Sequence, residues 1–314
     1  MPPPIPTLLE LDRLLASAET TAKRRLLVAV IRVRQEIPLG PIERAILSEN
    51  LEEAIRLVGI EPVLNAVAGL QGVAGPVRQA GWWDALRNLP AHLLRQPALL
   101  LSLGAHAEQS PAVMQRIATQ DLTRIRAVSA RTIAAIREQL TQGLAAGTPP
   151  RELARQLRHV VGLTSRQAAS VERFRVRLVE EGRPEGQVDR MVDRFSRRQL
   201  VIRTENIART EVMSALQGGK TAQWERLVAS GTINPEDWEV EWVTADDERT
   251  CPICEPLHGA RTAIGGTFVG RDGVHSGPAP AHPRCRCINR LVLKGFRRGQ
   301  SPAPARERIL RGAL

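Results

Sequence analysis

The sequence contains no tyrosine, and aromatic residues account for only 3% of its 314 positions. A core built from stacked aromatic rings is therefore excluded, although hydrophobic residues reach 43%. Leucine, alanine, valine and isoleucine must fill the interior, which favours helices that pack through aliphatic faces. The length fits two domains, or one long helical body with an appendage.

The sequence also lacks a long hydrophobic run. A membrane-spanning helix needs about 20 mostly apolar residues, whereas the nearest candidate, residues 62–77, is shorter and contains two prolines and three glycines. Residues 1–6, Met-Pro-Pro-Pro-Ile-Pro, do not have the charged segment and apolar core of a secretory signal. We therefore expect an intracellular protein with no stable membrane association.

Common catalytic motifs are missing as well. The sequence has no GxxxxGK[ST] phosphate loop, no GxGxxG motif after a strand, and no HExxH zinc-protease motif. His92 and His106 are isolated from other chemistry-bearing residues, and a lone histidine is usually a packed or surface residue. We expect no enzymatic activity and no small-molecule substrate.

Cysteine is absent from the first 250 residues, and all four cysteines then follow closely. Cys251 and Cys254 form a CxxC pair, and His282, Cys285 and Cys287 come about thirty residues later. This spacing is typical of a tetrahedral zinc site, and a closed shell of four protein ligands is structural rather than catalytic. Five candidates compete for four positions, so one of His282, Cys285 and Cys287 is expected to be spare. Disulfides would use the same even number of cysteines, but an intracellular setting disfavours them.

Positive charge is unevenly distributed within the net charge of +11. Residues 284–314 contain nine arginines or lysines and one acid, a net charge of +8, and residues 151–210 contain fourteen arginines and eight acids, a net charge of +6. Two interpretations of residues 151–210 are open. Their charges form either a solvated face with i,i+4 ion pairs or a face that binds a polyanion.

The basic C-terminal segment predicts contact with double-stranded DNA through non-specific electrostatics, because basic segments release counterions from polyanions without reading sequence. The candidate DNA-contacting residues are Arg290, Lys294, Arg297, Arg298, Arg306, Arg308 and Arg311.

Apolar periodicity, proline and glycine breaks, and a capping box at Thr164 to Gln167 define the expected helices. They cover residues 7–37, 42–58, 110–142, 148–161, 164–182 and 184–217. The state of residues 59–81 is ambiguous, Trp82 and Trp83 are expected to open a short helical piece, and Gly218 and Gly219 are expected to interrupt the last helix.

The hydrophobic period then changes from helix to strand. Residues 238–242 alternate strictly, which predicts a strand with Trp238, Val240 and Trp242 on its buried side. Residues 260–269, centred on two glycines, suggest a hairpin, and residues 288–293 read as a last short strand. Three brief strands offer too little core to fold alone, so a bound metal would supply the missing stability.

The expected fold is therefore mainly α, with long helices packed by aliphatic faces and a small zinc-stapled α+β unit at the C-terminal end. We divide the chain into a helical N-terminal region at residues 1–147, a domain at residues 148–292 and a basic tail at residues 293–314. Within the domain, residues 148–230 are helical and residues 231–292 form the zinc-bearing α+β unit.

Several of these motifs occur together in a recognisable order. Residues 207–212 (IARTEV), Trp242, the D-x-x-R-x-C-x-x-C run at 246–254, the LHG at 257–259 and the H-P-x-C-R-C run at 282–287 resemble the Mu F-like phage head morphogenesis proteins. These are minor head proteins of tailed bacteriophages, and the resemblance covers roughly residues 150–292.

The resemblance implies a low-copy protein that acts in procapsid assembly and in DNA packaging or delivery. It implies association with the portal protein and other capsid components, and a surface that faces packaged DNA. The expected location is the virion, in the capsid interior or at the portal vertex, and the host cytoplasm during assembly.

Two other functions remain open from the residues alone. A regulatory, nucleic-acid-binding zinc module would need a recognition helix beside the cysteines. A metal-dependent nuclease would need a second metal site. Its candidate residues are Asp246, Asp247, Glu248, His258 and His275.

Overall fold

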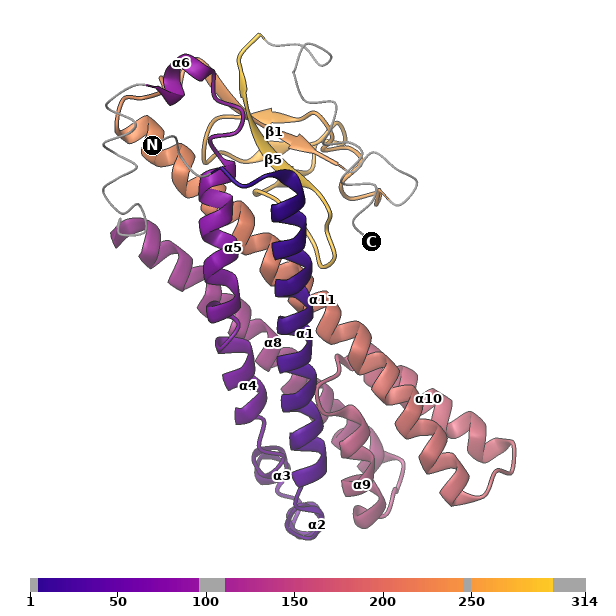
Figure 1. The fold of residues 1–314 in the computed structure, drawn as a ribbon. Helices are drawn as coiled ribbons and strands as arrows, with labels where there is room; N and C mark the ends of the chain where they lie inside the picture. Colours follow the sequence, from indigo (N-terminus) through magenta and orange to yellow (C-terminus); the bar gives the residue numbers. More distant parts are fainter. Residues whose placement is uncertain (1–4, 96–110, 245–249, 296–314) are drawn as a thin grey trace. The chain divides into compact units, whose positions relative to one another are not determined.

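A computed structural model describes residues 5–95, 111–244 and 250–295, with the side chains of residues 111–126 left out. The described chain is mainly helical with a small C-terminal sheet region (Figure 1), which confirms the expected fold class. The helices are α1 (Leu8–Glu36), α2 (Leu39–Leu47), α3 (Leu51–Leu57), α4 (Glu61–Ala68), α5 (Gln71–Asp84), α6 (Ala91–Leu94), α8 (Pro111–Ala145), α9 (Pro150–Val160), α10 (Ser165–Glu180) and α11 (Glu185–Ala229). The strands are β1 (Trp238–Val243), β2 (Arg261–Thr262), β3 (Phe268–Val269), β4 (His275–Ser276) and β5 (Ile288–Leu293).

The chain forms two compact units, each assembled from separated parts of the sequence. The sheet unit comprises the described residues of 1–21, 71–117 and 206–314, and the helical unit comprises those of 22–70 and 118–205. Helices α1, α8 and α11 contribute residues to both units. The division after residue 147 that the sequence favours stays a prediction.

The helical unit has the aliphatic core that the composition requires. Val30 and Val33 of α1, Leu153 and Leu157 of α9, and Leu200 of α11 are buried together in one cluster. Two of the four phenylalanines in the sequence, in α10 and α11, only pack against this cluster as partly buried residues. Interdigitated aliphatic ridges therefore stabilise these helices, as expected in a chain poor in aromatic residues.

Several helix boundaries follow the predictions and others correct them. α1 has the expected extent, and α10 begins with the expected capping box, in which Thr164 and Gln167 cap each other's backbone. The single helix expected at residues 42–58 is instead split into α2 and α3. The split arises because Glu49 adopts a positive φ of 56° and the Asn50 side chain accepts a hydrogen bond from the Glu53 N–H, which starts a new helix.

The ambiguous region at residues 59–81 is helical, as α4 and most of α5. Trp82 and Trp83 lie in the last turn of α5 and do not open a new helix. Within the described residues, no single helix has the length and hydropathy needed to cross a bilayer, although residues 51–57 and 61–84 meet the criterion when counted together as one bent pair.

Gly218 and Gly219 do not interrupt α11, which runs unbroken for 45 residues. The reason is a close approach between α5 and α11 inside the sheet unit. A Cβ atom on Gly219 would collide with the carbonyl oxygen of Arg78, and one on Gly81 would collide with the carbonyl oxygen of Leu216. Glycine is thus needed here for backbone packing rather than for a turn, and helix–helix contact outweighs its low helix propensity.

A buried ion pair lies in the same contact between α5 and α11. Lys220 Nζ lies 3.0 Å from Asp84 Oδ2, with both side chains almost fully buried, and Arg87 Nε donates to Asp84 Oδ1 at 2.6 Å. Trp224 lies beneath the Lys220 ammonium group and donates its indole N–H to the Ala85 carbonyl. Such a pair fixes the register of the two helices, because separating its partners leaves a charge buried alone.

The sheet unit contains two small sheets. β1 is the central strand of the order β2-β1-β5, and it pairs antiparallel with β5 from Trp238–Leu293 to Val243–Ile288 (Figure 1). The inward side chains Trp238, Val240 and Trp242 are buried, as the alternation predicts.

The hairpin expected at residues 260–269 is wrong. β2 pairs with the free edge of β1, whereas β3 pairs with β4 in a separate two-stranded sheet. The chain does turn where the glycines predict it, since the Gly266 N–H donates to the Ala263 carbonyl. After the turn, Phe268 is buried with its ring edge-on to Trp242 at 5.3 Å, and β3 pairs with β4 instead of with β2.

The two neighbouring glycines of α11 provide a test of the close helix contact. Gly219→Ala is expected to lower the free energy of unfolding by about 1–3 kcal/mol, because the added methyl group forces the helix backbones apart. Gly218→Ala is the matched control: a Cβ there meets nothing within 4 Å, and alanine is favoured over glycine within a helix by about 0.5–1 kcal/mol. Urea unfolding followed by circular dichroism measures both, and equal stability of the two variants would contradict the contact.

Candidate functional site

The first two cysteines lie in a tight turn that follows β1. The N–H groups of Cys254 and Glu255 both donate to the Cys251 carbonyl, at 3.0 and 2.9 Å. The end of this segment is tied back to the sheet, because the Gly259 N–H donates to the Trp242 carbonyl and the Trp242 N–H donates to the Ala260 carbonyl. The turn therefore presents both sulfur atoms from a position fixed by β1.

The second ligand segment lies immediately before β5. The Cys285 N–H donates to the His282 carbonyl at 3.1 Å, which folds this segment into a turn, and Cys287 directly precedes the first residue of the strand. β1 and β5 are paired neighbours. The register of the sheet thus brings together two cysteine segments that are about thirty residues apart in the sequence.

The five predicted ligands gather into two overlapping groups that share Cys254. One group is Cys251, Cys254 and His282, the other is Cys254, Cys285 and Cys287, and the ligand atoms within each group lie within 4.8 Å of one another. The structure thus confirms that these side chains can hold a metal ion.

The donor atoms and one sulfur–sulfur distance fit a soft tetrahedral metal. Cys254 Sγ and Cys285 Sγ are 3.7 Å apart, close to the roughly 3.8 Å edge of a tetrahedron with zinc–sulfur bonds of about 2.3 Å. His282 Nε2 lies 2.9 Å from Cys251 Sγ and 3.1 Å from Cys254 Sγ. The other ring nitrogen, Nδ1, lies 2.8 Å from the Pro283 carbonyl oxygen. A proton on Nδ1 donated to this carbonyl would leave the Nε2 lone pair facing the sulfur atoms, which is the arrangement of metal-binding histidines.

The cysteines are free thiols, which disfavours the disulfide alternative. Packing them together changes their acidity. A hydrogen bond from the Cys254 thiol, and a second from Cys287, lower the pKa of Cys285, whereas the bond with Cys285 is the main cause of the raised pKa of Cys254. The cluster therefore favours a thiolate at Cys285, and thiolate is the form that binds metals.

Helix α11 holds the second ligand segment in place through hydrogen bonds. The Arg284 N–H donates to Thr210 Oγ1 at 3.4 Å, and the Asn289 N–H donates to Gln217 Oε1 at 3.2 Å. Asn289 also accepts, at its Oδ1, a hydrogen bond from the Ala279 N–H. Thr210 belongs to the motif at residues 207–212, so part of that motif positions the loop that carries the ligands.

The sequence analysis missed Gln217 and Asn289 as positioning residues. Both side chains are about 98–99% buried, and a buried polar side chain normally has a structural partner. The available signal was an asparagine inside the apolar strand at residues 288–293, where a β-branched or aliphatic residue is the common choice.

Of the seven candidate DNA-contacting residues, the structure describes Arg290 and Lys294. Arg290 lies on β5, where its Nε donates to Glu241 Oε2 at 2.5 Å, and Arg261 lies 3.7 Å from the other oxygen of this carboxylate. Arg290 thus has a structural partner within the sheet. Lys294 is exposed. The remaining candidates, Arg297, Arg298, Arg306, Arg308 and Arg311, lie outside the described residues.

The residues of the two alternative functions are not brought together into a site by the described chain. Asp246, Asp247 and Glu248 lie outside the described residues. His258 Nδ1 accepts a hydrogen bond from the Thr244 N–H at 3.2 Å, while His275 is exposed on β4. Between Cys254 and His282, where every residue is described, the chain forms turns and short strands and no recognition helix.

Comparison with known proteins links the chain to one family. A family model described as Phage Mu protein F like protein matches residues 134–290, which is half of the chain and includes all five members of the cysteine–histidine cluster. Neither the curated proteins nor the solved structures gave a match.

The ion pair on β5 gives a testable prediction about the two charged residues of this segment. Arg290→Gln is expected to lower the free energy of unfolding by about 1–3 kcal/mol, because the buried Glu241 carboxylate loses its closest partner. Lys294→Gln, which removes one charge from an exposed position nearby, should leave stability unchanged. Thermal unfolding of both variants measures this difference, and similar melting temperatures would show that the ion pair is unimportant.

Proposed function

The chain belongs to the Phage Mu protein F like family, and from this premise we propose that it is a minor head protein of a tailed bacteriophage. The family is one of phage head morphogenesis proteins, whose setting is the virion and whose partners are other capsid components. In our proposal the chain acts in procapsid assembly, associates with the portal protein, and takes part in DNA packaging or delivery.

The family match is the observation that carries this proposal. It begins in α8 and ends within β5, so it covers residues 134–205 of the helical unit and residues 206–290 of the sheet unit, including the cysteine cluster. The matched region therefore includes both the long helix α11 and the loops that rest on it. A long helix with loops packed against it suits a protein whose work is to bind other assembly components.

We further propose that the cysteine cluster holds one structural zinc ion, with Cys251, Cys254, His282 and Cys285 as ligands and Cys287 as the spare thiol. We favour Cys285 over Cys287 because the distance from its Sγ to Cys254 Sγ matches the separation of two ligand atoms in a tetrahedral zinc site. Four protein ligands leave no open coordination position, so bound zinc would tie the loops between β1 and β5 together without doing chemistry. In keeping with this, we propose that the protein is not an enzyme.

The basic tail supports the proposed contact with DNA. Residues 293–314 contain Lys294, five arginines and one acid, a net charge of +5. Such a segment binds double-stranded DNA through released counterions and does not need sequence-specific contacts. An assembly protein that meets concentrated phosphate in a capsid interior would use this surface, after synthesis in the host cytoplasm.

The zinc proposal predicts different behaviour for two cysteine variants. Cys254→Ser is expected to abolish zinc binding and lower the melting temperature, because Cys254 belongs to both halves of the cluster. Cys287→Ser removes an equally buried thiol and should keep about one zinc per chain. Elemental analysis of purified proteins measures this; full zinc content in Cys254→Ser, or loss of zinc in Cys287→Ser, would contradict the ligand assignment.

The assembly proposal predicts a stable complex with the portal protein of the same phage. On co-expression, the full chain is expected to elute with the portal ring in size-exclusion chromatography and to be found at low copy number in purified heads by mass spectrometry. Co-expression with an unrelated ring-forming protein in place of the portal is the control and should give no such complex. A chain that elutes alone and is missing from purified heads would overturn the proposal.

A further inference from the structure

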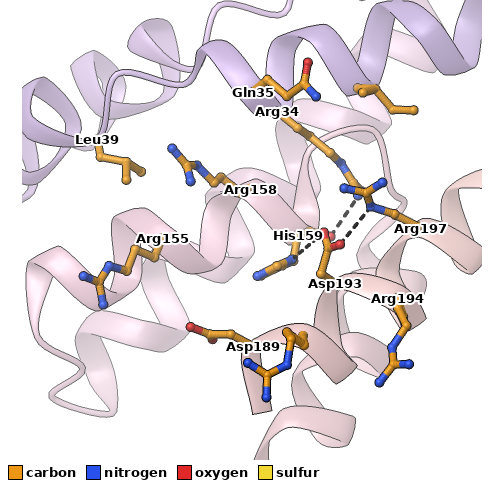
Figure 2. A pocket seen from close by; sticks show the side chains of 12 residues that line it. Arg34, Gln35, Leu39, Arg155, Arg158, His159, Asp189, Asp193, Arg194 and Arg197 are labelled. Carbon is orange, nitrogen blue, oxygen red and sulfur yellow. Dashed lines mark hydrogen bonds and ion pairs between the residues drawn. The ribbon is translucent and has the colours of Figure 1, made fainter. Parts of the chain in front are cut away.

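The helical unit contains an open pocket with a volume of about 780 Å³, formed by residues of α1, α2, α9 and α11. Figure 2 shows arginine side chains from several of these elements around it. The six arginines of this pocket are Arg34, Arg155, Arg158, Arg190, Arg194 and Arg197. Five of them lie within residues 151–210, the arginine-rich region for which the charge count left a polyanion-binding face open.

The pocket has a strong excess of positive charge. Its six arginines face only two acids, Asp189 and Asp193, which gives 6 − 2 = +4. Burial, reinforced by Arg175, lowers the pKa of the remaining titratable group, His159, to about 4, so that it is neutral near pH 7. Positive charge held in one concave surface raises the local potential and attracts anions.

The two acids are already engaged by arginines. Asp193 Oδ2 lies 2.8 Å from Arg197 Nε, and Asp189 Oδ1 lies 3.4 Å from Arg175 Nη1. Arg155 pairs with the exposed carboxylate of Glu185. No described carboxylate forms an ion pair with Arg158, Arg190 or Arg194, so these three guanidinium groups are available for an anion from outside the unit.

Arg34 is the least expected of the six, because its side chain is only 8% exposed. Its Nε and Nη2 donate to the carbonyls of Val161 and His159, at 2.9 and 3.3 Å, while its Nη1 has no partner among the described residues. Burial lowers the pKa of Arg34 to about 10, so the group still carries its charge at neutral pH. A buried cation with a free donor at the wall of a pocket is costly unless an anion completes its hydrogen bonds.

We propose that this pocket binds phosphate groups of a nucleic-acid backbone. Guanidinium groups suit phosphate because their planar arrangement of donors matches two of its oxygens at once. The binding surface extends beyond one phosphate, since Arg194 also lines a second pocket, together with Arg173, Arg177 and Arg198 and without any acidic residue.

The spacing along α11 favours a polymer over a single small anion. Residues 194, 197 and 198 follow residue 190 by four, seven and eight positions, so all four lie on one face of the helix. From Arg190 to Arg198 this face is about 12 Å long, a length over which duplex DNA presents about seven phosphate charges. The site is separate from the basic tail, and the proposal does not rest on the zinc ion or on portal association.

The test measures binding of the full-length chain to a fluorescein-labelled 30-base-pair duplex of arbitrary sequence, by anisotropy between about 50 and 200 mM salt. In Arg190→Gln/Arg194→Gln, both changes are at exposed positions. Affinity at 100 mM salt is expected to fall about tenfold, and the slope of log K against log salt to become shallower by about 1.8, since each lost phosphate contact contributes about 0.9.

The matched control, Arg151→Gln/Arg166→Gln, removes the same charge from exposed positions of the helical unit outside both pockets. It should change affinity less than about twofold. A third variant, Arg306→Gln/Arg308→Gln/Arg311→Gln, reports on the tail alone, and its loss should add to that of the pocket variant because the two sites are independent.

Two results would overturn the proposal. Equal losses in the pocket variant and the matched control would mean that only total charge matters. A larger effect of the pocket variant on binding of a labelled poly-glutamate peptide than on binding of the duplex would identify an acidic protein segment as the ligand. Circular dichroism of each variant confirms that the helices are intact.

Discussion

The close contact between α5 and α11 is the constraint on which the sheet unit depends. Gly81 and Gly219 let the two helix backbones meet, and the buried Asp84–Lys220 pair fixes their register. A slip by one residue would place a Cβ against a carbonyl oxygen and separate the two buried charges, so only one register is compatible with both features. The strands and loops that follow in the sheet unit are therefore positioned by α11, whose register against α5 is fixed.

The cysteine cluster is one of those features. Hydrogen bonds from Arg284 to Thr210 and from Asn289 to Gln217 place the second ligand segment on α11, while pairing with β1 places the first. Among the described residues between β1 and β5, the large aliphatic or aromatic side chains that are buried are Leu257 and Phe268. A segment of this kind loses much conformational entropy on folding, and a metal that joins its two ends would compensate for that loss.

The elements that depend on local sequence signals were predictable, and those that depend on distant contacts were not. The capping box at Thr164 and the alternation at Trp238 to Trp242 act within a few residues, and the structure bears out both. The two cysteine segments also gather as their spacing predicts, although the register of β1 and β5 is what brings them together. The continuity of α11 through Gly219 depends on Arg78, about 140 residues earlier. The pairing of β2 with β1, about twenty residues earlier, and of β3 with β4 likewise forms within the folded sheet unit, where Phe268 contacts Trp242. No local propensity encodes such contacts.

The arginine-rich region at residues 151–210 shows why a charge count alone left two interpretations open. Some of its arginines do pair with neighbouring acids, as Arg197 does with Asp193, which is the solvated-face interpretation. Others, including Arg190 and Arg194, lie on the same helix one turn away and have no described carboxylate partner. The acids are therefore too few and too unevenly placed to neutralise one face of α11. The helix period decides which charged side chains share a face of α11. The structure therefore distinguishes arginines that pair with acids from arginines that do not, whereas a net charge does not make this distinction.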